Sequence, residues 1–157
     1  MLLLLAVLAL TACGSKSGSS TTTTAAASPG PGEVLYAGGD WAVVVDKGKA
    51  AAYHRVAGSW RADRTGRVQV RVLGPKPGST VAKIPQVGVE LSAKKPLIES
   101  AIWVDGEELL AKGGGLTPTR GTIYGAPAAP LAKGAHTAVA YGRTGTSATA
   151  VAWTFRV

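Results

Sequence analysis

Gly and Pro interrupt residues 33–157 about every eight to twelve positions, and this spacing limits the fold more than any other feature of the sequence. Strands of about five or six residues fit between such turns, whereas helices of ordinary length do not. Within this region Val68, Val70 and Val72 alternate with polar residues, as in a strand with one buried face. The sequence therefore predicts an all-β protein.

Further strands are expected wherever apolar residues alternate, or run together, between turn residues. These are residues 41–45, 50–56, 86–93, 97–104, 107–110, 122–125, 136–143 and 148–157. Residues 46–49 and Asp105-Gly106 carry tight-turn signals, and the Gly-rich stretch 112–121 is expected to be a loop. Roughly seven strands after residue 66 predict a two-sheet antiparallel sandwich over residues 66–157.

Residues 33–65 predict a separate and smaller unit, a β-meander of short strands joined by tight turns. A sheet of this size buries too little apolar surface to be stable alone. We therefore expect the meander to pack on the sandwich that follows it.

The N-terminus combines an apolar run, residues 2–10, with the sequence Leu10-Thr11-Ala12-Cys13. The run is too short to span a bilayer, but its length is typical of a secretory signal peptide. The last four residues resemble the lipobox of bacterial lipoproteins, in which the Cys receives a diacylglyceryl group and the chain is cut before it. The resemblance implies a signal peptide at 1–12, a lipidated Cys13 and an extracytoplasmic protein anchored to the cell membrane.

The alternative for this segment is a buried N-terminal helix with an inert Cys13. The tract that follows favours the signal peptide, because residues 13–32 are rich in Ser, Thr, Ala, Gly and Pro and predict a disordered linker. No Lys or Arg precedes the apolar run, where signal peptides carry a basic segment, so a longer natural N-terminus is expected. A single Cys leaves no partner for an internal disulfide.

A second resemblance lies in the turn and core residues of the C-terminal region. They are Pro77-Gly78-Ser79, Val104-Asp105-Gly106, Pro130-Leu131, Gly134, His136, Trp153 and Phe155. This pattern is similar to the bacterial immunoglobulin-like domains of surface proteins and covers about residues 67–157. It implies an immunoglobulin-like (Ig-like) β-sandwich and no particular activity. Residues 142–148 replace the Asp-rich loop that many such domains carry, which removes acidic residues that could hold calcium.

The formal net charge is +8, and a basic chain can attract nucleic acid, anionic lipid or acidic wall polymers. An exported protein is not expected to meet nucleic acid. Five Arg residues lie close together and are candidate contacts for an anionic surface, the alternative being a solvated face: Arg55, Arg61, Arg64, Arg67 and Arg71. Three aromatic residues of the meander, Trp41, Tyr53 and Trp60, form either its small core or a binding face.

The sequence predicts no catalytic residue, metal ligand or cofactor. Ser92 and Lys95 have the S-x-x-K spacing of penicillin-binding enzymes, but Pro96 disfavours the helix that this chemistry requires. His54 and His136 are expected to be ordinary strand residues.

These observations predict a membrane-anchored lipoprotein with a non-catalytic domain for binding, adhesion or spacing at the cell envelope. The expected partners are the membrane, wall polymer, anionic lipid or another envelope protein. The alternatives are an accessory or regulatory subunit of a membrane enzyme or transporter, which needs one stoichiometric protein partner, and an enzyme of unrecognised type.

Overall fold

The chain folds into strands and loops, without a helix, over the part that the computed structural model describes, which is residues 28–157 except for the side chains of 114–116. The predicted all-β class is confirmed. The strands, in chain order, are β1 (Glu33–Gly38), β2 (Trp41–Asp46), β3 (Lys49–Val56), β4 (Ser59–Ala62), β5 (Val68–Gly74), β6 (Val87–Ala93), β7 (Leu97–Val104), β8 (Glu107–Glu108), β9 (Lys112–Thr117), β10 (Arg120–Gly125), β11 (Ala135–Thr144) and β12 (Ala148–Arg156).

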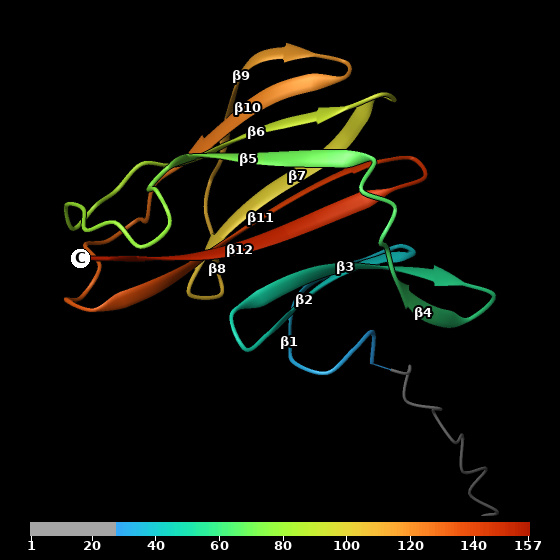
Figure 1. Ribbon diagram of the computed structural model, residues 1–157, viewed down its shortest axis with the longest axis horizontal. Helices are drawn as coiled ribbons and strands as arrows, with labels where there is room; N and C mark the ends of the chain where they lie inside the picture. The colour runs from blue at the N-terminus through green and yellow to red at the C-terminus, as the bar shows by residue number, and fades with distance from the viewer. Residues whose placement is uncertain (1–27) are drawn as a thin grey trace, which may run out of the picture.

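These strands form three antiparallel four-stranded sheets that lie one above another as layers (Figure 1). We call the sheet of order β5-β6-β10-β9 the front sheet and that of order β12-β11-β7-β8 the central sheet. The third sheet, β1-β2-β3-β4, keeps its strands in chain order and is the meander. The central sheet therefore has a neighbour on each of its faces.

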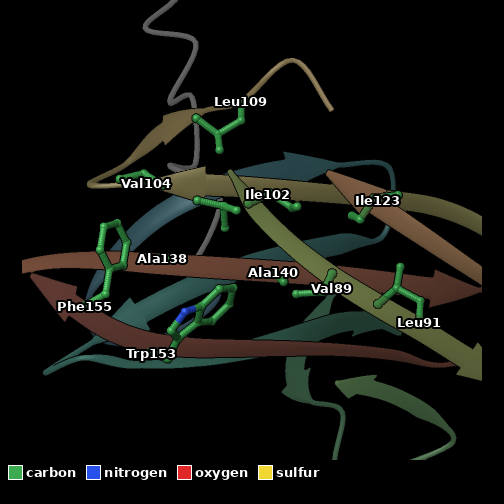
Figure 2. Close-up of a cluster of buried hydrophobic side chains, with 11 residues drawn as sticks. Val89, Leu91, Ile102, Val104, Leu109, Ile123, Ala138, Ala140, Trp153 and Phe155 are labelled. Atoms are coloured by element: carbon green, nitrogen blue, oxygen red, sulfur yellow. The ribbon is translucent and has the colours of Figure 1, made fainter. Parts of the chain in front are cut away.

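The front core fills the space between the front and central sheets (Figure 2). Val87, Val89 and Leu91 of β6 reach it from the front sheet and are at most 2% exposed, as their alternation predicts. Ile102 and Phe155 reach it from the central sheet and are fully buried. Large aliphatic and aromatic side chains thus hold these two sheets together.

The rear core lies between the central sheet and the meander. Trp41 and Val43 of β2 pack there against Trp103 and Tyr141 of the central sheet. All four side chains are at most 5% exposed. The meander therefore packs on the central sheet, as its small size predicts.

Residues 101–104 of β7 and 138–141 of β11 are buried on both faces, because each segment contributes alternate residues to the two cores. In β7, Ile102 faces the front core and Trp103 faces the rear core. In β11, Ala140 faces the front core and Tyr141 faces the rear core. This double burial explains why residues 101–104 and 138–141 are continuous apolar runs rather than alternations.

Two hairpins have the turns that the sequence predicts. Asp105 and Gly106 have φ angles of 49° and 85°, and Lys47 and Gly48 have φ angles of 49° and 73°. Two consecutive positive φ angles define the type I′ turn, whose twist suits a two-residue hairpin. Asn, Asp and Gly tolerate this conformation best, so Lys47 is the exception among the four.

The prediction of a loop over residues 112–121 was wrong. Residues Lys112–Thr117 form β9, an edge strand that pairs with β10. Gly has a low strand propensity because it has no side chain to pack, and that argument predicted the loop. The backbone of β10 nevertheless offers hydrogen-bonding groups to any extended neighbour, and these pair with β9.

The last residues of the predicted linker lie against the meander. A side chain at Gly30 would overlap the ring of Tyr53, and one at Gly32 would overlap the carbonyl group of Val45. The predicted signal peptide, Cys13 and the rest of the predicted linker lie outside the described residues. No helix able to cross a membrane is found in residues 28–157.

Candidate functional site

A polar clamp joins the segment that follows the meander to the central sheet at one end of the molecule. Asp63, in the segment between β4 and β5, accepts hydrogen bonds from the backbone N–H groups of Thr65 and Ala148, both at 2.8 Å. The hydroxyl groups of Thr65 and Ser147 are 2.6 Å apart. These contacts fix the segment before β5 on the turn between β11 and β12.

The pKa of Asp63 reflects this clamp. Burial alone would raise the pKa, but the hydrogen bonds from Thr65 and Ala148 outweigh it and lower the pKa below its ordinary value. The carboxylate therefore stays ionised and its charge is satisfied locally by the backbone.

Beside the clamp lies a pocket of about 600 Å³. It is placed where β5 begins, where β6 ends and where β11 turns into β12, at the end of the molecule opposite the C-terminus (Figure 1). Val68 and Ala93 are an antiparallel pair, so the beginning of β5 lies beside the end of β6. The residues lining the pocket are Gly66, Arg67, Gln69, Ser92, Ala93, Lys94, Lys95, Thr144 and Thr146.

The charge of the pocket is positive. Arg67, Lys94 and Lys95 line it, and its lining contains no carboxylate. Within the described part of the chain, none of these three cations forms an ion pair. Lys95 Nζ donates to Thr146 Oγ1 at 3.5 Å, a long contact that leaves the ammonium group available to a ligand.

The structure does not bring the five predicted Arg residues onto one surface. Arg67 lines the pocket, whereas Arg71 pairs with Glu90 at 3.2 Å on the outer face of the front sheet. Arg55 lies over the ring of Trp60, 5.9 Å from its centroid.

The other two predicted Arg residues lie apart from each other. Arg61 pairs with His54 across β3 and β4, so its side chain leaves the meander on the face opposite to Arg55. Arg64 is exposed in the segment before β5.

Glu90 is shared between two Arg residues, because Arg120 also contacts it, at 2.8 Å. Hydrogen bonds from Arg71 and Arg120 lower the pKa of the Glu90 carboxyl. Arg71 therefore shares one carboxylate with Arg120 on the front sheet, and of the predicted set Arg67 is the one that reaches the pocket.

The three predicted aromatic residues do not form a single face. Trp41 is 5% exposed in the rear core, where its ring stacks on His54 at 4.1 Å. Tyr53 and Trp60 are half-buried on the opposite face of the meander, and the ring of Tyr53 lies against Gly30. Trp41 therefore fits the interpretation that these residues form a small core, and not the interpretation that they form a binding face.

Ser92 and Lys95 line the same pocket, but Ser92 is in strand β6 and not at a helix N-terminus. Lys95 donates to Thr146 and has no hydrogen bond with Ser92 in the part of the chain that is described. Within residues 28–157, no three His, Cys, Asp or Glu side chains come together as a possible metal site.

His136 is a buried residue with two acceptors. Its Nδ1 lies 2.6 Å from Asp105 Oδ2, and its Nε2 lies 2.8 Å from the carbonyl oxygen of Ala132. A ring nitrogen that faces an acceptor must carry a proton, so this geometry favours the imidazolium. The hydrogen bonds to Asp105 and Ala132 raise the pKa of His136 above its ordinary value, although burial acts against them.

A second polar cluster lies at the edge of the rear core. Glu99 and Arg143 form an ion pair there, and the rings of Tyr36 and Tyr141 lie 5.7 Å apart. The hydroxyl group of Tyr141 is buried and has no hydrogen-bond partner among the described residues. Burial raises the pKa of Tyr141, so this phenol is neutral at all ordinary pH values.

Sequence reasoning did not identify Lys94, Lys95 and Thr146 as a site together with Arg67. The S-x-x-K pattern draws attention to Ser92 and Lys95 as a possible catalytic pair, and residues 142–148 stand out only because they replace an Asp-rich loop. Pairing the consecutive strands 67–73 and 86–93 would have placed Lys94 and Lys95 beside Arg67, because a hairpin returns the chain to its start. Nothing in the sequence places Thr146 beside them.

No protein-family model matches this sequence. A comparison with curated proteins finds none that is similar.

Proposed function

We propose that this chain is a lipid-anchored bacterial envelope protein whose folded part is a non-catalytic Ig-like binding domain. Cys13 carries the lipid, residues 13–32 connect it to the domain, and the β-sandwich presents its cationic pocket to an anionic partner at the envelope. Contact with this partner supports adhesion to the envelope or spacing of its components.

The order of the strands supports the Ig-like assignment. The front sheet has the order β5-β6-β10-β9 and the central sheet has the order β12-β11-β7-β8. Lettered from β5 as strand A, these are the A-B-E-D and G-F-C-C′ sheets of an immunoglobulin sandwich. Residues 66–157 would then be one domain, with the meander as an added layer behind its G-F-C sheet.

The cationic pocket is the observation that carries the binding role. Its lining has three cations and no carboxylate or imidazole that could serve as a general base. Its other polar groups are the side chains of Gln69, Ser92, Thr144 and Thr146. Such a lining suits the recognition of an anion better than it suits acid–base catalysis.

Lipid attachment is tested by growing cells that express the full chain with radiolabelled palmitate. We expect label in the protein and recovery in the membrane fraction, and loss of both in Cys13→Ser, because only a thiol forms the thioether to diacylglycerol. Equal labelling of the Cys13→Ser chain would contradict the anchor.

The binding role is tested by cross-linking the lipoprotein in native membranes and identifying what it captures. Recovery with wall polymer or anionic lipid, and loss of that recovery in high salt, is the expected result. A single stoichiometric protein partner would instead support an accessory subunit of a membrane enzyme or transporter.

A further inference from the structure

We propose that the cationic pocket binds the phosphodiester groups of a flexible anionic polymer, with Arg67, Lys94 and Lys95 as the phosphate contacts. This inference rests on the proposed function and deepens it, because it names the chemistry of the anionic partner.

Uncompensated positive charge accumulates at the pocket. Glu90 attracts Arg71 and Arg120, Glu99 attracts Arg143, and Asp105 attracts His136. The three cations of the pocket have no such partner among the described residues, although like charges held close together repel one another. A bound polyanion would relieve that repulsion.

The cationic and hydroxyl donors of the pocket come from three segments of the chain. Arg67 precedes β5, Lys94 and Lys95 follow β6, and Thr146 lies in the turn between β11 and β12. A phosphodiester carries its charge on two non-bridging oxygens of a tetrahedral phosphorus, and each of them can accept more than one hydrogen bond, so the group can accept from donors on three segments at once. A carboxylate presents two oxygens in one plane and matches a single fork of donors.

The shape of the site favours a chain over a flat surface as its ligand. The cations line a concave pocket at the end of the sandwich rather than a protruding surface. A single chain that carries phosphates can enter such a pocket, whereas the headgroups of a flat bilayer meet the rim. The structure therefore favours a polymer over a membrane surface.

The rigidity of the site supports a built pocket. The Thr144 hydroxyl accepts a hydrogen bond from the N–H group of Ser147 at 3.1 Å and so holds the turn. Asp63 fixes Ala148 from the other side. The segments that carry Arg67 and Thr146 are thus held together before any ligand arrives, which lowers the entropic cost of binding.

The test uses the purified full-length chain in a neutral detergent, with poly(glycerol phosphate) as the probe and the binding constant measured over a range of salt concentrations. On single-stranded nucleic acid, which is a flexible phosphodiester chain, each neutralised phosphate contributes about −0.7 to the slope of log K against log salt, and we expect a similar value for this probe. Three contacts predict a slope of about −2. Each of the variants Arg67→Gln, Lys94→Gln and Lys95→Gln should make the slope about 0.7 less steep.

Matched controls are Lys76→Gln, Lys83→Gln and Lys133→Gln. These three Lys residues are exposed and lie outside the pocket. They change the net charge by the same amount, so an effect of overall charge alone would appear equally in both sets. We expect the slope to stay within error of the wild-type slope in the controls, and equal changes in the two sets would overturn the proposal.

Two further probes separate the possible anions. Polyglutamate of equal charge should bind about tenfold more weakly, the equivalent of one lost charged hydrogen bond. Vesicles of phosphatidylglycerol in phosphatidylcholine should bind equally well to wild type and to the three pocket variants. Equal affinity for polyglutamate, or vesicle binding that is lost only in the pocket variants, would contradict a phosphodiester polymer as the ligand.

The Cys13→Ser chain distinguishes this proposal from the lipid anchor. If the polymer binds the Cys13→Ser chain as well as wild type while palmitate labelling fails in both, the anchor is wrong and the pocket stands. If labelling succeeds and the salt slope is flat, the anchor stands and the pocket proposal is wrong.

Discussion

The front and rear cores differ in the kind of side chain that fills them. The front core is built from large branched residues such as Leu91 and Ile102, together with Trp153 and Phe155. The rear core combines Trp41 and Trp103 with several Ala residues, and the Glu99–Arg143 ion pair lies at its edge. The central sheet supplies one wall of each core. The difference indicates that the front core holds the domain together, while the rear core attaches a smaller layer to it.

The largest expected effect is that of Phe155→Ala in the front core. The ring is fully buried, and removing it leaves a cavity, so the free energy of unfolding should fall by about 3–5 kcal/mol. Chemical denaturation followed by tryptophan fluorescence measures this loss. A loss below about 1 kcal/mol would mean that the front core is not the main source of stability.

In the rear core, Val43→Ala should cost less, about 1.5–3 kcal/mol, because a smaller side chain is lost from a fully buried site. Hydrogen exchange should then show faster opening of β1–β4 than of β5 and β6. If all strands instead open together, the two cores form one cooperative unit, and β1–β4 are not a separately opening layer.

The hydrogen bond between His136 and Asp105 predicts a pH-dependent contribution of intermediate size. The fold raises the pKa of His136, so its stabilising effect is complete below the unfolded pKa of about 6.5 and is lost as the pH rises through the folded pKa. Asp105→Asn should flatten this dependence and cost about 1 kcal/mol at pH 6, a low value because Asp105 is half exposed. Denaturation curves from pH 5 to 9 measure both effects, and an unchanged slope would refute this role.

The smallest effect is expected for Tyr141→Phe in the rear core. The hydroxyl group is buried without a partner in the described structure, so its removal should be neutral or should raise the free energy of unfolding by up to about 1 kcal/mol. Thermal unfolding monitored by circular dichroism detects the change. A clear loss of stability would show that the hydroxyl group does bond within the rear core.

Much of the front sheet was predictable because its strands have one buried face. Alternation at Val68–Val72 and at Val87–Leu91 identified both the strands and their inward residues. Tight turns such as Asp105-Gly106 were predictable as well, since they depend on backbone angles that few residues adopt. By contrast, the Gly-rich strand β9 was missed, because its pairing comes from β10 and not from its own side chains.

The cationic pocket was predictable only in part. Arg67 was recognised as a candidate contact for an anion, but it was grouped with Arg residues that are close in sequence and not in space. Arg71 has a carboxylate partner from a neighbouring strand, and Arg55 and Arg61 lie on opposite faces of the meander. Lys94, Lys95 and Thr146 join Arg67 through strand pairing and packing.

The sequence by itself determined the all-β class, most of the strands and the tight turns, because these depend on local patterns of side chains and backbone angles. Only the tertiary structure decided that the central sheet is covered on both faces, and it also decided which cations meet. Both depend on contacts between residues far apart in the chain, such as Asp63 with Ala148, and local periodicity carries no information about such contacts.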